Sequence, residues 1–325
     1  MADIVTLGEL LIDFVPTTSN ASLIEAPAFK KAPGGAPANV AAGLAKLGVS
    51  CAFLGKVGDD PFGEFLEKTL SDLGVNTQGL VFSHEARTAL AFVSLKADGE
   101  REFMFYRHPS ADMLYTPDEV DYPLIKHAKI FHFGSISLIS EPSRSATLAA
   151  LAAARENGVL ISYDPNLRLA LWPDPSAAKD GMLSVWEKVD LIKVSEEELT
   201  FLTGLDDIDE AVNTLWHENL KLLVVTLGKE GCRYYTPGFQ GFVEGISAKA
   251  IDTTGAGDGF VAGLLKGVSE HPEALLNESI LSKVCLYANA VGALTTTQLG
   301  AIPALPTIQE VRLFLESKNI DIQWL

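Results

Sequence analysis

The sequence predicts an α/β protein built on a mostly parallel, doubly wound sheet that is flanked by helices. Short, nearly continuous apolar runs alternate along most of the chain with stretches rich in Ala and Leu. Strands of that composition are typical of parallel sheets that are covered on both faces. The chain has 325 residues, of which 47% are hydrophobic. That length is close to the upper limit for one core, so we expect a single domain over residues 1–325.

The expected strands are the short apolar runs. In chain order they are Ile4–Leu7, Cys51–Val57, Ile130–Phe133, Val159–Tyr163, Leu191–Val194, Leu222–Leu227, Cys232–Thr236 and Gln240–Ile246. The expected helices are the longer stretches rich in Ala and Leu, several of which stop at a glycine. They are Ala38–Leu47, Gly63–Leu73, Pro142–Asn157, Ser176–Trp186, Gly257–Val268, Ala274–Leu294 and Ile308–Glu316.

Two segments, 11–31 and 88–107, interrupt this alternation. The first holds the strand-like run LIDFV and a polar turn region. The second reads as a hairpin around Ala97-Asp98-Gly99, and Asp-Gly between alternating runs is a strong hairpin signal. Because both segments alternate, we expect a small antiparallel β lid over the edge of the main domain, with two plain surface hairpins as the alternative. An exposed lid sheet can also pair across a two-fold axis, which would give a homodimer.

Charge and cysteine content exclude several classes of protein. The chain has 42 acidic and 25 basic residues, a formal net charge of −17. Such a surface repels phosphate backbones and anionic lipid headgroups, so we expect neither nucleic acid nor a membrane as partner. The three cysteines are scattered, which argues against a disulfide framework or a zinc knuckle. We see no secretory leader and no apolar run of about 18 residues, so we expect a cytoplasmic protein.

The most informative motif is Asp252-Thr-Thr-Gly-Ala-Gly-Asp258-Gly-Phe260, directly before an apolar helix. Gly255, Ala256 and Gly257 lack bulk, so their backbone N–H groups can approach an anion at the start of that helix. A carboxylate at Asp258 would repel bound phosphate. Its presence makes sense if a hydroxyl lies between the two and gives its proton to Asp258 as its oxygen attacks phosphorus. The alternative is an ordinary helix start with an acidic residue serving the dipole.

A second motif, Ala32-Pro-Gly34-Gly35-Ala-Pro-Ala-Asn39, precedes the first long helix. The glycine pair permits close approach of a ligand to the backbone, and Asn39 supplies both a donor and an acceptor. Together with Asp13 from the first lid segment, these residues form a set suited to sugar hydroxyls. Alone, such a loop is more often a plain turn.

Taken together, the two motifs resemble the paired signatures of the ribokinase-like (PfkB) carbohydrate kinases. The resemblance covers essentially the whole chain and includes GGAPANVAAGLAKLG, GKVG and DTTGAGDGF. The segments DGEREFMFYRHPSADMLY, GSISLISEPSRSA, SYDPNLRLALWP and LKLLVVTLGKEGC look like those of the fructokinases in this family. The resemblance implies phosphorylation of D-fructose at its 6-hydroxyl, with fructose and ATP as partners.

The resemblance also implies roles for particular residues. The catalytic set is Asp258 as base, Gly255, Ala256 and Gly257 as anion hole, and Arg168 near the phosphoryl acceptor. The sugar contacts are Asp13, Gly34, Gly35 and Asn39, with Tyr106 and Arg107 either closing on the substrate or serving as ordinary edge-strand residues. The nucleotide contacts are Lys193, Thr226, Gly228, Gly231 and Asn289. Glu198 would organise waters around Mg²⁺ that arrives with ATP, and Asp252 and Thr254 match the upstream half of a K⁺ site.

Other interpretations stay open or fail. A 2-keto-3-deoxygluconate kinase shares the scaffold and would turn Arg107 and Arg168 toward a carboxylate, and other sugar kinases of the family are less favoured. A non-catalytic sugar-binding or regulatory homologue would be expected to lose Asp258 or an anion-hole glycine. The chain lacks G-x-x-x-x-G-K-[ST], which excludes a P-loop kinase, and its glycine motif lacks the spacing of a Rossmann fingerprint. The six histidines form no close pair of metal ligands.

Overall fold

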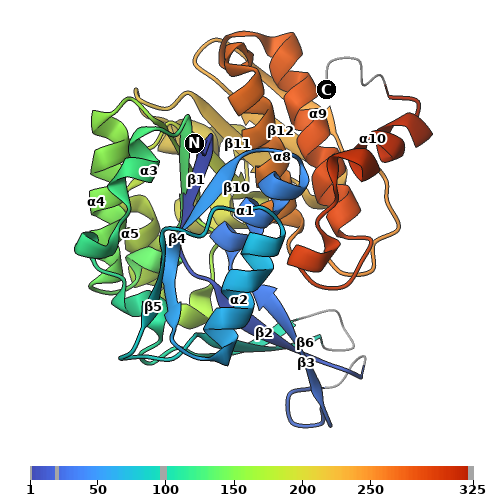
Figure 1. Cartoon of the computed structure of the whole chain (residues 1–325). Coiled ribbons are helices and arrows are strands. Elements are labelled where there is room, and N and C mark those ends of the chain that lie inside the picture. Colours follow the sequence, from blue (N-terminus) through green and yellow to red (C-terminus); the bar gives the residue numbers. More distant parts are fainter. Residues whose placement is uncertain (1, 19–21, 96–100, 321–325) are drawn as a thin grey trace.

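The computed structural model describes residues 2–18, 22–95 and 101–320. The expected turn Ala97-Asp98-Gly99, and Ser19 and Asn20 of the polar turn region, lie outside the described residues. Within the described residues, two layers of helices enclose a large central sheet, and a small second sheet projects from one end of the body (Figure 1).

The central sheet has nine strands in the order β13-β12-β11-β10-β9-β8-β1-β4-β5. Every pairing from β11 to β5 is parallel, and β12 and β13 add antiparallel at one edge. The strands are β1 (Ile4–Leu7), β4 (Cys51–Gly58), β5 (Leu80–Ser83), β8 (Ile130–Gly134), β9 (Leu160–Asp164), β10 (Leu191–Ser195), β11 (Leu222–Thr226), β12 (Gly231–Tyr235) and β13 (Gln240–Glu244). The strand order reverses between β1 and β8, and open α/β sheets bind ligands beyond the carboxyl ends of their strands at such a point.

Helices cover both faces of this sheet. They are α1 (Ala36–Lys46), α2 (Pro61–Asp72), α3 (Tyr122–Lys126), α4 (Ser143–Glu156), α5 (Pro175–Leu183), α6 (Glu196–Thr203), α7 (Ile208–Leu215), α8 (Ala256–Glu270), α9 (Glu278–Thr295) and α10 (Ile308–Ser317). Most buried side chains form one cluster under α1, α2, α8, α9 and α10 or a second under α3 to α7, and a third, small cluster lies at the second sheet. Neighbouring β1 residues enter opposite clusters, Ile4 the first and Val5 the second, as strand geometry requires. The predicted fold class is confirmed.

The lid is a four-stranded sheet of order β3-β2-β6-β7. Its strands are β2 (Leu11–Pro16), β3 (Phe29–Gly34), β6 (Leu90–Leu95) and β7 (Arg101–Tyr106). β2 with β3 and β6 with β7 form the antiparallel hairpins that the sequence predicts, and a parallel pairing of β2 with β6 joins them. β3 runs on to Gly34, so the lid leads directly into the glycine pair that precedes α1.

Several element boundaries differ from the sequence-based expectation. The expected helix Ala274–Leu294 is wrong at its start, because a 3-10 turn (Pro272–Leu276) precedes Asn277, whose side chain caps α9. α1 begins two residues early, with Pro37 in its first turn, a position where the missing N–H costs nothing. The short strand β5 and the helices α3, α6 and α7 were not among the expected elements.

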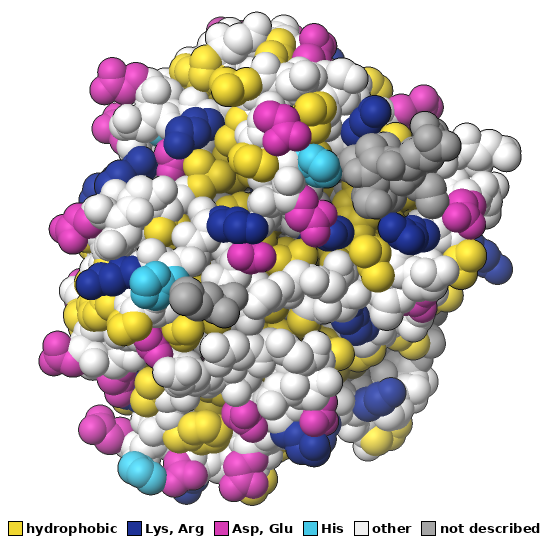
Figure 2. All heavy atoms as spheres, turned by 45° about the horizontal axis from the view of Figure 1, so that its top comes forward, with side chains coloured by type: hydrophobic (Ala, Val, Ile, Leu, Met, Phe, Trp, Pro, Cys, Tyr) yellow, Lys and Arg dark blue, Asp and Glu magenta, His cyan; other side chains and the backbone are white. Residues whose placement is uncertain are grey.

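On the face shown in Figure 2, acidic and basic side chains are interspersed rather than gathered by sign. Within the described ranges, no helix combines the length and apolar character needed to cross a bilayer.

Candidate active site

Two cavities lie at the carboxyl ends of the parallel strands. The smaller, about 250 Å³, lies between the lid, the start of α1 and the start of α8. The larger, about 760 Å³, lies between the turn after β11, the segment after β13 and the helices α8 and α9. Thr253 and Gly257 line both cavities, so the two meet at the start of α8. Two substrates that occupied them would meet at that point.

The start of α8 forms the junction between the cavities. Gly255 caps the helix in the left-handed region, with φ 76°, and a Cβ there would lie 3.0 Å from Ala301. A Cβ on Gly257 would lie 3.3 Å from Nζ of Lys193. Glycine at these two positions avoids both contacts, and the first N–H groups of a 15-residue helix face the space between the cavities, where they suit an anion.

Asp258 follows at once and points into the smaller cavity, where it is 7% exposed. Asn39 on α1 donates from Nδ2 to its Oδ2 at 2.7 Å, and Asn166 donates to its Oδ1 at 3.2 Å. Burial raises the pKa of Asp258, against these two donors and the positive charges of Arg168 and Lys193. The result is a buried, oriented carboxylate with increased basicity, which suits a general base.

Beside the junction lies a buried charged cluster from the ends of β9 and β10. Lys193 Nζ pairs with Asp164 at 3.1 Å, and both side chains are less than 10% exposed. Burial raises the pKa of Asp164 to about 7. Burial would also raise the pKa of Glu198, but the charge of Lys193 and N–H donation from Ser195 and Leu167 lower it overall. Of the two carboxyl groups in this cluster, Glu198 is therefore the one that stays ionised more readily.

Glu198 is also part of a reciprocal helix cap. The Ser195 hydroxyl accepts the N–H of Glu198 at 3.1 Å, and the Glu198 carboxylate accepts the N–H of Ser195 at 2.8 Å. This is a capping box at the start of α6. Ser195 and Glu198 therefore share a structural role that Glu196 and Glu197 do not have.

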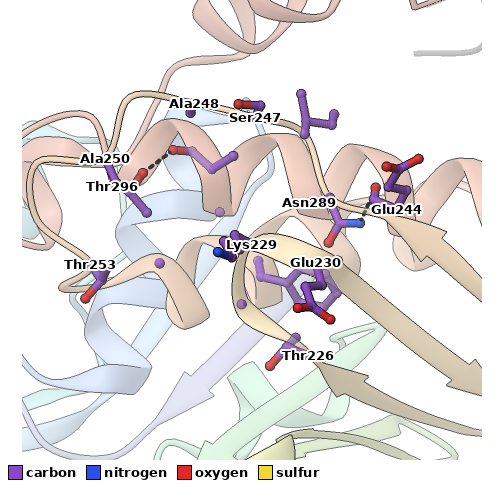
Figure 3. Close-up of a pocket in the computed structure, with 18 of the residues that line it drawn as sticks. Thr226, Lys229, Glu230, Glu244, Ser247, Ala248, Ala250, Thr253, Asn289 and Thr296 are labelled. Atoms are coloured by element: carbon purple, nitrogen blue, oxygen red, sulfur yellow. Dashed lines mark hydrogen bonds between the residues drawn. The ribbon is translucent and has the colours of Figure 1, made fainter.

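The larger cavity collects most of the expected nucleotide residues. Thr226, Gly228 and Gly231 line it from the turn between β11 and β12, and Asn289 lines it from α9. Figure 3 shows Asn289 beside Glu244 and facing the turn that carries Lys229 and Glu230. The Asn289 amide donates to the carbonyls of Val243 and Glu244 at 3.3 Å each, which holds the end of β13 against α9.

The loop that carries Asp252 packs behind the start of α8. The Asp252 carboxylate accepts from the N–H and hydroxyl of Thr254 and from the N–H of Gly300, at 2.6–2.9 Å. Lys46 at the end of α1 donates to the carbonyls of Ile302 and Leu305 and so ties the same region to α1. Among the described residues, no group of three or more His, Cys, Asp or Glu side chains is arranged to hold a metal ion by itself.

Four residues that the sequence assigned to sugar or nucleotide contacts lie outside the cavity expected for them. Tyr106 is 58% exposed and stacks edge-on against Phe92, because strand alternation turns Phe105 rather than Tyr106 into the smaller cavity. Arg107 is buried and paired with Asp112, outside the cavity lining. Gly34 also lies outside the lining.

A Cβ on Gly34 would collide with the Asp13 carboxylate at 2.2 Å, so this glycine makes room for Asp13, which does line the cavity. Lys193 lines the smaller cavity rather than the larger one.

The lining residues of the smaller cavity that sequence reasoning missed include Glu9, Phe105 and Asn166. Asn166 lies in the segment DPNLR that supported the resemblance, and its positive φ of 49° marks an unusual backbone position. Glu9 lies two residues after the end of the first strand, which places it at the carboxyl edge of the sheet. That position was the one available signal for Glu9.

Comparison with known proteins agrees with this geometry. A family model described as pfkB family carbohydrate kinase matches residues 1–308. The chain belongs to the PfkB family of carbohydrate kinases. It is 58% identical to "Probable fructokinase-4" of Arabidopsis thaliana over 314 residues, 96% of each chain. It is also 58% identical to "Probable fructokinase-6, chloroplastic" of the same plant, over 95% of this chain and 81% of that one.

Solved structures give the same result. The fructokinase from Vibrio cholerae O395 in its fructose, ADP and calcium ion bound form has a TM-score of 0.89 and 40% identity, covering 97% of this chain and 99% of that one. A double mutant fructokinase from the same organism, in its fructose, ADP and potassium ion bound form, has a TM-score of 0.88 and 39% identity, covering 97% and 98%.

The resemblance seen in the motifs is thus confirmed, and with it the class of enzyme, a sugar kinase. The similar structures hold nucleotide together with metal ions, which supports metal–nucleotide use in the family. One relative is named chloroplastic, so family membership does not assign a compartment.

Proposed function

We propose that this PfkB kinase transfers the γ-phosphoryl group of ATP to the 6-hydroxyl of D-fructose. The observation that carries the proposal is the position of Asp258. Its carboxylate lies in the smaller cavity, one residue beyond Gly257, which lines both cavities. A hydroxyl bound in the smaller cavity would therefore contact a base on one side and a phosphoryl group at the start of α8 on the other.

In the proposed reaction, Asp258 accepts the proton of the sugar hydroxyl while its oxygen attacks the γ-phosphorus. The new O–P bond forms as the bond between the γ-phosphorus and the bridging oxygen of ADP breaks. The N–H groups at the start of α8 stabilise the negative charge that develops on the transferred group. Asn39 and Asn166 keep the base in one orientation through their bonds to its two oxygens. Arg168 lines the smaller cavity and adds positive charge near Asp258.

We assign the larger cavity to ATP and place Mg²⁺ with its phosphates. Glu198 fits a metal-bound water shell because its carboxylate is buried, is held by two backbone N–H groups and has a lowered pKa. When bound, the ion would neutralise charge on the phosphates. We also propose that Asp252 and Thr254 belong to a potassium-responsive loop. The Asp252 carboxylate already ties this loop to Gly300, on the stretch that packs against Gly255.

Two alternatives fit the site less well. A 2-keto-3-deoxygluconate kinase would turn Arg107 and Arg168 toward the substrate carboxylate, yet Arg107 is paired with Asp112 in a buried ion pair and only Arg168 of the two lines the cavity. A non-catalytic homologue is expected to lose the base or the anion hole. Here Gly255, Gly257 and Asp258 are all present, and Asp258 is held by two amides.

One coupled assay tests the proposal. ADP formation would be followed with fructose, glucose, ribose and 2-keto-3-deoxygluconate, each at several concentrations, with Asp258→Asn as the inactive control. We expect the highest kcat/KM with fructose. A higher kcat/KM with 2-keto-3-deoxygluconate would show that fructose is not the preferred substrate, but would leave the proposed mechanism unchanged. No ADP formation with any of the four sugars would favour the non-catalytic homologue.

We further propose that residues 1–325 act as one cytoplasmic unit that dimerises through its lid. The lid face that carries Phe14 and Phe92 also holds the exposed side chains of Met104 and Tyr106. Partly exposed aromatic rings in a row are a common feature of self-association surfaces. Analytical ultracentrifugation of the wild type and Tyr106→Ser would test it, with a shift of the variant toward monomer as the expected result and equal sedimentation as the contrary one.

A further inference from the structure

The lid strand β7 leads into a buried ion pair that the proposed mechanism does not use. Met104 and Tyr106 of this strand are exposed, whereas Phe105 is partly buried and Arg107 is 4% exposed. Because side chains two residues apart in a strand face the same side, Phe105 and Arg107 both face the body of the molecule. Arg107 donates to Asp112 from Nε at 2.8 Å and also from a terminal nitrogen. A buried ion pair is often no more stabilising than a packed apolar pair, so stability alone does not account for it.

Asp112 is held from the body of the molecule rather than from the lid. It lies in a 3-10 turn (Ala111–Leu114) and is 6% exposed. Its second oxygen accepts a hydrogen bond from the Ser110 hydroxyl at 2.5 Å. At the end of the same turn, the carbonyl of Leu114 accepts a hydrogen bond from Nζ of Lys56 on β4 at 3.1 Å. The turn is thus tied to the central sheet, and the ion pair ties β7 to the turn.

The other strand of this lid hairpin, β6, is held at the same end of β4. Thr88, two residues before β6, donates its N–H to the Asp60 carboxylate at 2.8 Å and its hydroxyl to the same carboxylate at 2.9 Å. The Thr88 hydroxyl also accepts the N–H of Gly58, the last residue of β4, at 3.0 Å. Each strand of the hairpin therefore has its own buried carboxylate, Asp60 for β6 and Asp112 for β7. Loss of the ion pair would free β7 while β6 stayed fixed.

Phe105 connects the ion pair to the sugar cavity. It lies two residues before Arg107 and lines the smaller cavity from the lid, whereas Asn39 and Asp258 line it from α1 and α8. A sugar bound there would turn its C–H surface to the aromatic ring and its reacting hydroxyl to Asp258. The distance of Phe105 from the cavity therefore decides how closely that hydroxyl is held to the base.

We propose that Arg107 and Asp112 form a positioning pair, which fixes the end of β7 to the body and so sets the distance between Phe105 and the bound sugar. This inference rests on the proposed function and adds to it a role for Arg107 that needs no contact with substrate. Neither member of the pair lines either cavity. The pair therefore acts on binding and alignment of the sugar and leaves ATP binding unchanged.

The test compares Asp112→Asn with a matched control, Asp190→Asn. Asp190 is also a buried carboxylate paired with an arginine, Arg155, but it precedes β10 at the amino edge of the sheet. For each variant, kcat, KM for fructose and KM for ATP would be measured. We expect Asp112→Asn to lower kcat/KM for fructose about 10-fold or more and to keep KM for ATP within about 2-fold of wild type. Asp190→Asn should keep all three constants.

A double-mutant cycle with Phe105→Ala shows whether the pair acts through that ring. In the Phe105→Ala background, Asp112→Asn should lower kcat/KM for fructose by no more than about 2-fold, because the contact that the pair positions is already gone. An equal fall with and without Phe105 would overturn the inference. So would a rise in KM for ATP as large as the rise in KM for fructose, or a wild-type kcat/KM in Asp112→Asn.

Ser110→Ala is the milder variant that decides the question if Asp112→Asn does not fold. It removes only the hydroxyl bound to the second oxygen of Asp112. We expect a fall in kcat/KM for fructose of about 3-fold, which disappears in the Phe105→Ala background. Unchanged constants in Ser110→Ala would then overturn the inference. Wild type that phosphorylates another sugar in place of fructose would refute the proposed function instead, and the same cycle with that sugar would still decide the role of the pair.

Discussion

Replacing Gly255 by alanine separates the cost of a strained backbone from the cost of a blocked anion site. Gly255 has φ 76°, where an alanine costs about 1–2 kcal/mol. Its new methyl group would lie 3.0 Å from Cα and Cβ of Ala301, and crowding of this kind costs a further ~1–3 kcal/mol. We therefore expect Gly255→Ala to lower the free energy of unfolding by about 2–5 kcal/mol in total.

The matched control is Gly158→Ala, at the end of α4. Gly158 has φ 69°, and a methyl group there would meet no atom within 4 Å. This control carries only the backbone cost, about 1–2 kcal/mol. Because both variants stiffen the unfolded chain equally, the difference between them reports the contact with Ala301 alone. Urea unfolding monitored by tryptophan fluorescence measures both values.

Activity gives the second readout of Gly255→Ala. If the methyl group pushes the helix start away from Ala301, the N–H groups at the phosphoryl site move by a fraction of an ångström. We expect kcat with saturating fructose and ATP to fall by about 10-fold or more, since small misplacements at a reacting centre are costly. Gly158→Ala should keep wild-type kcat. Equal stability of the two variants, together with a normal kcat in Gly255→Ala, would refute the assignment of the phosphoryl site to the start of α8.

Three further predictions concern other parts of the site and fold. Asn166→Ala removes a donor that lowers the pKa of Asp258, so the acidic limb of the pH profile of kcat/KM should move to higher pH; an unmoved limb would count against the bond. Lys193→Met leaves buried Asp164 without its cation and should lower the free energy of unfolding by about 3–5 kcal/mol, measured in urea, where an unchanged midpoint would show the pair to be dispensable. Asp60→Ala removes the cap of α2 and should cost about 1–2 kcal/mol at pH 7. Burial raises the pKa of Asp60, but N–H donation outweighs burial and lowers this pKa below 3.8 in the folded state. The stabilisation by the cap is therefore complete above pH 3.8 and is lost as the pH falls through the folded-state pKa. A cost of Asp60→Ala that stays constant down to about pH 2 would contradict this prediction.

The sequence predicted the fold well because its local signals agree with the global arrangement. The apolar run Ile4–Leu7 and the Ala-rich run before Gly48 need no tertiary information to be read as strand and helix. The break at Asn277 was missed because the apolar residues on either side of it keep helical spacing. Only the capping bond from Asn277 to the N–H of Ile280 reveals where α9 begins.

The site was predictable where a motif carried it and not where the sheet assembled it. Asp258 and Gly255 lie in one short segment, so their proximity follows from the sequence. Glu9 reaches the cavity only because β1 lies at the centre of the sheet beside β4 and β8. The register of β7 on β6 decides whether Phe105 or Tyr106 faces the smaller cavity, and the sequence does not reveal that register.

The central claim is that Asp258 takes the proton of the sugar hydroxyl. Its most direct test is the turnover of Asp258→Asn together with its affinity for fructose, measured by titration calorimetry. A general base contributes about 10²–10⁴-fold to the rate, and asparagine keeps the shape of the side chain while losing the basic oxygen. We predict that kcat falls by at least about 100-fold while the Kd for fructose changes little. Near-normal turnover with intact binding would contradict the account.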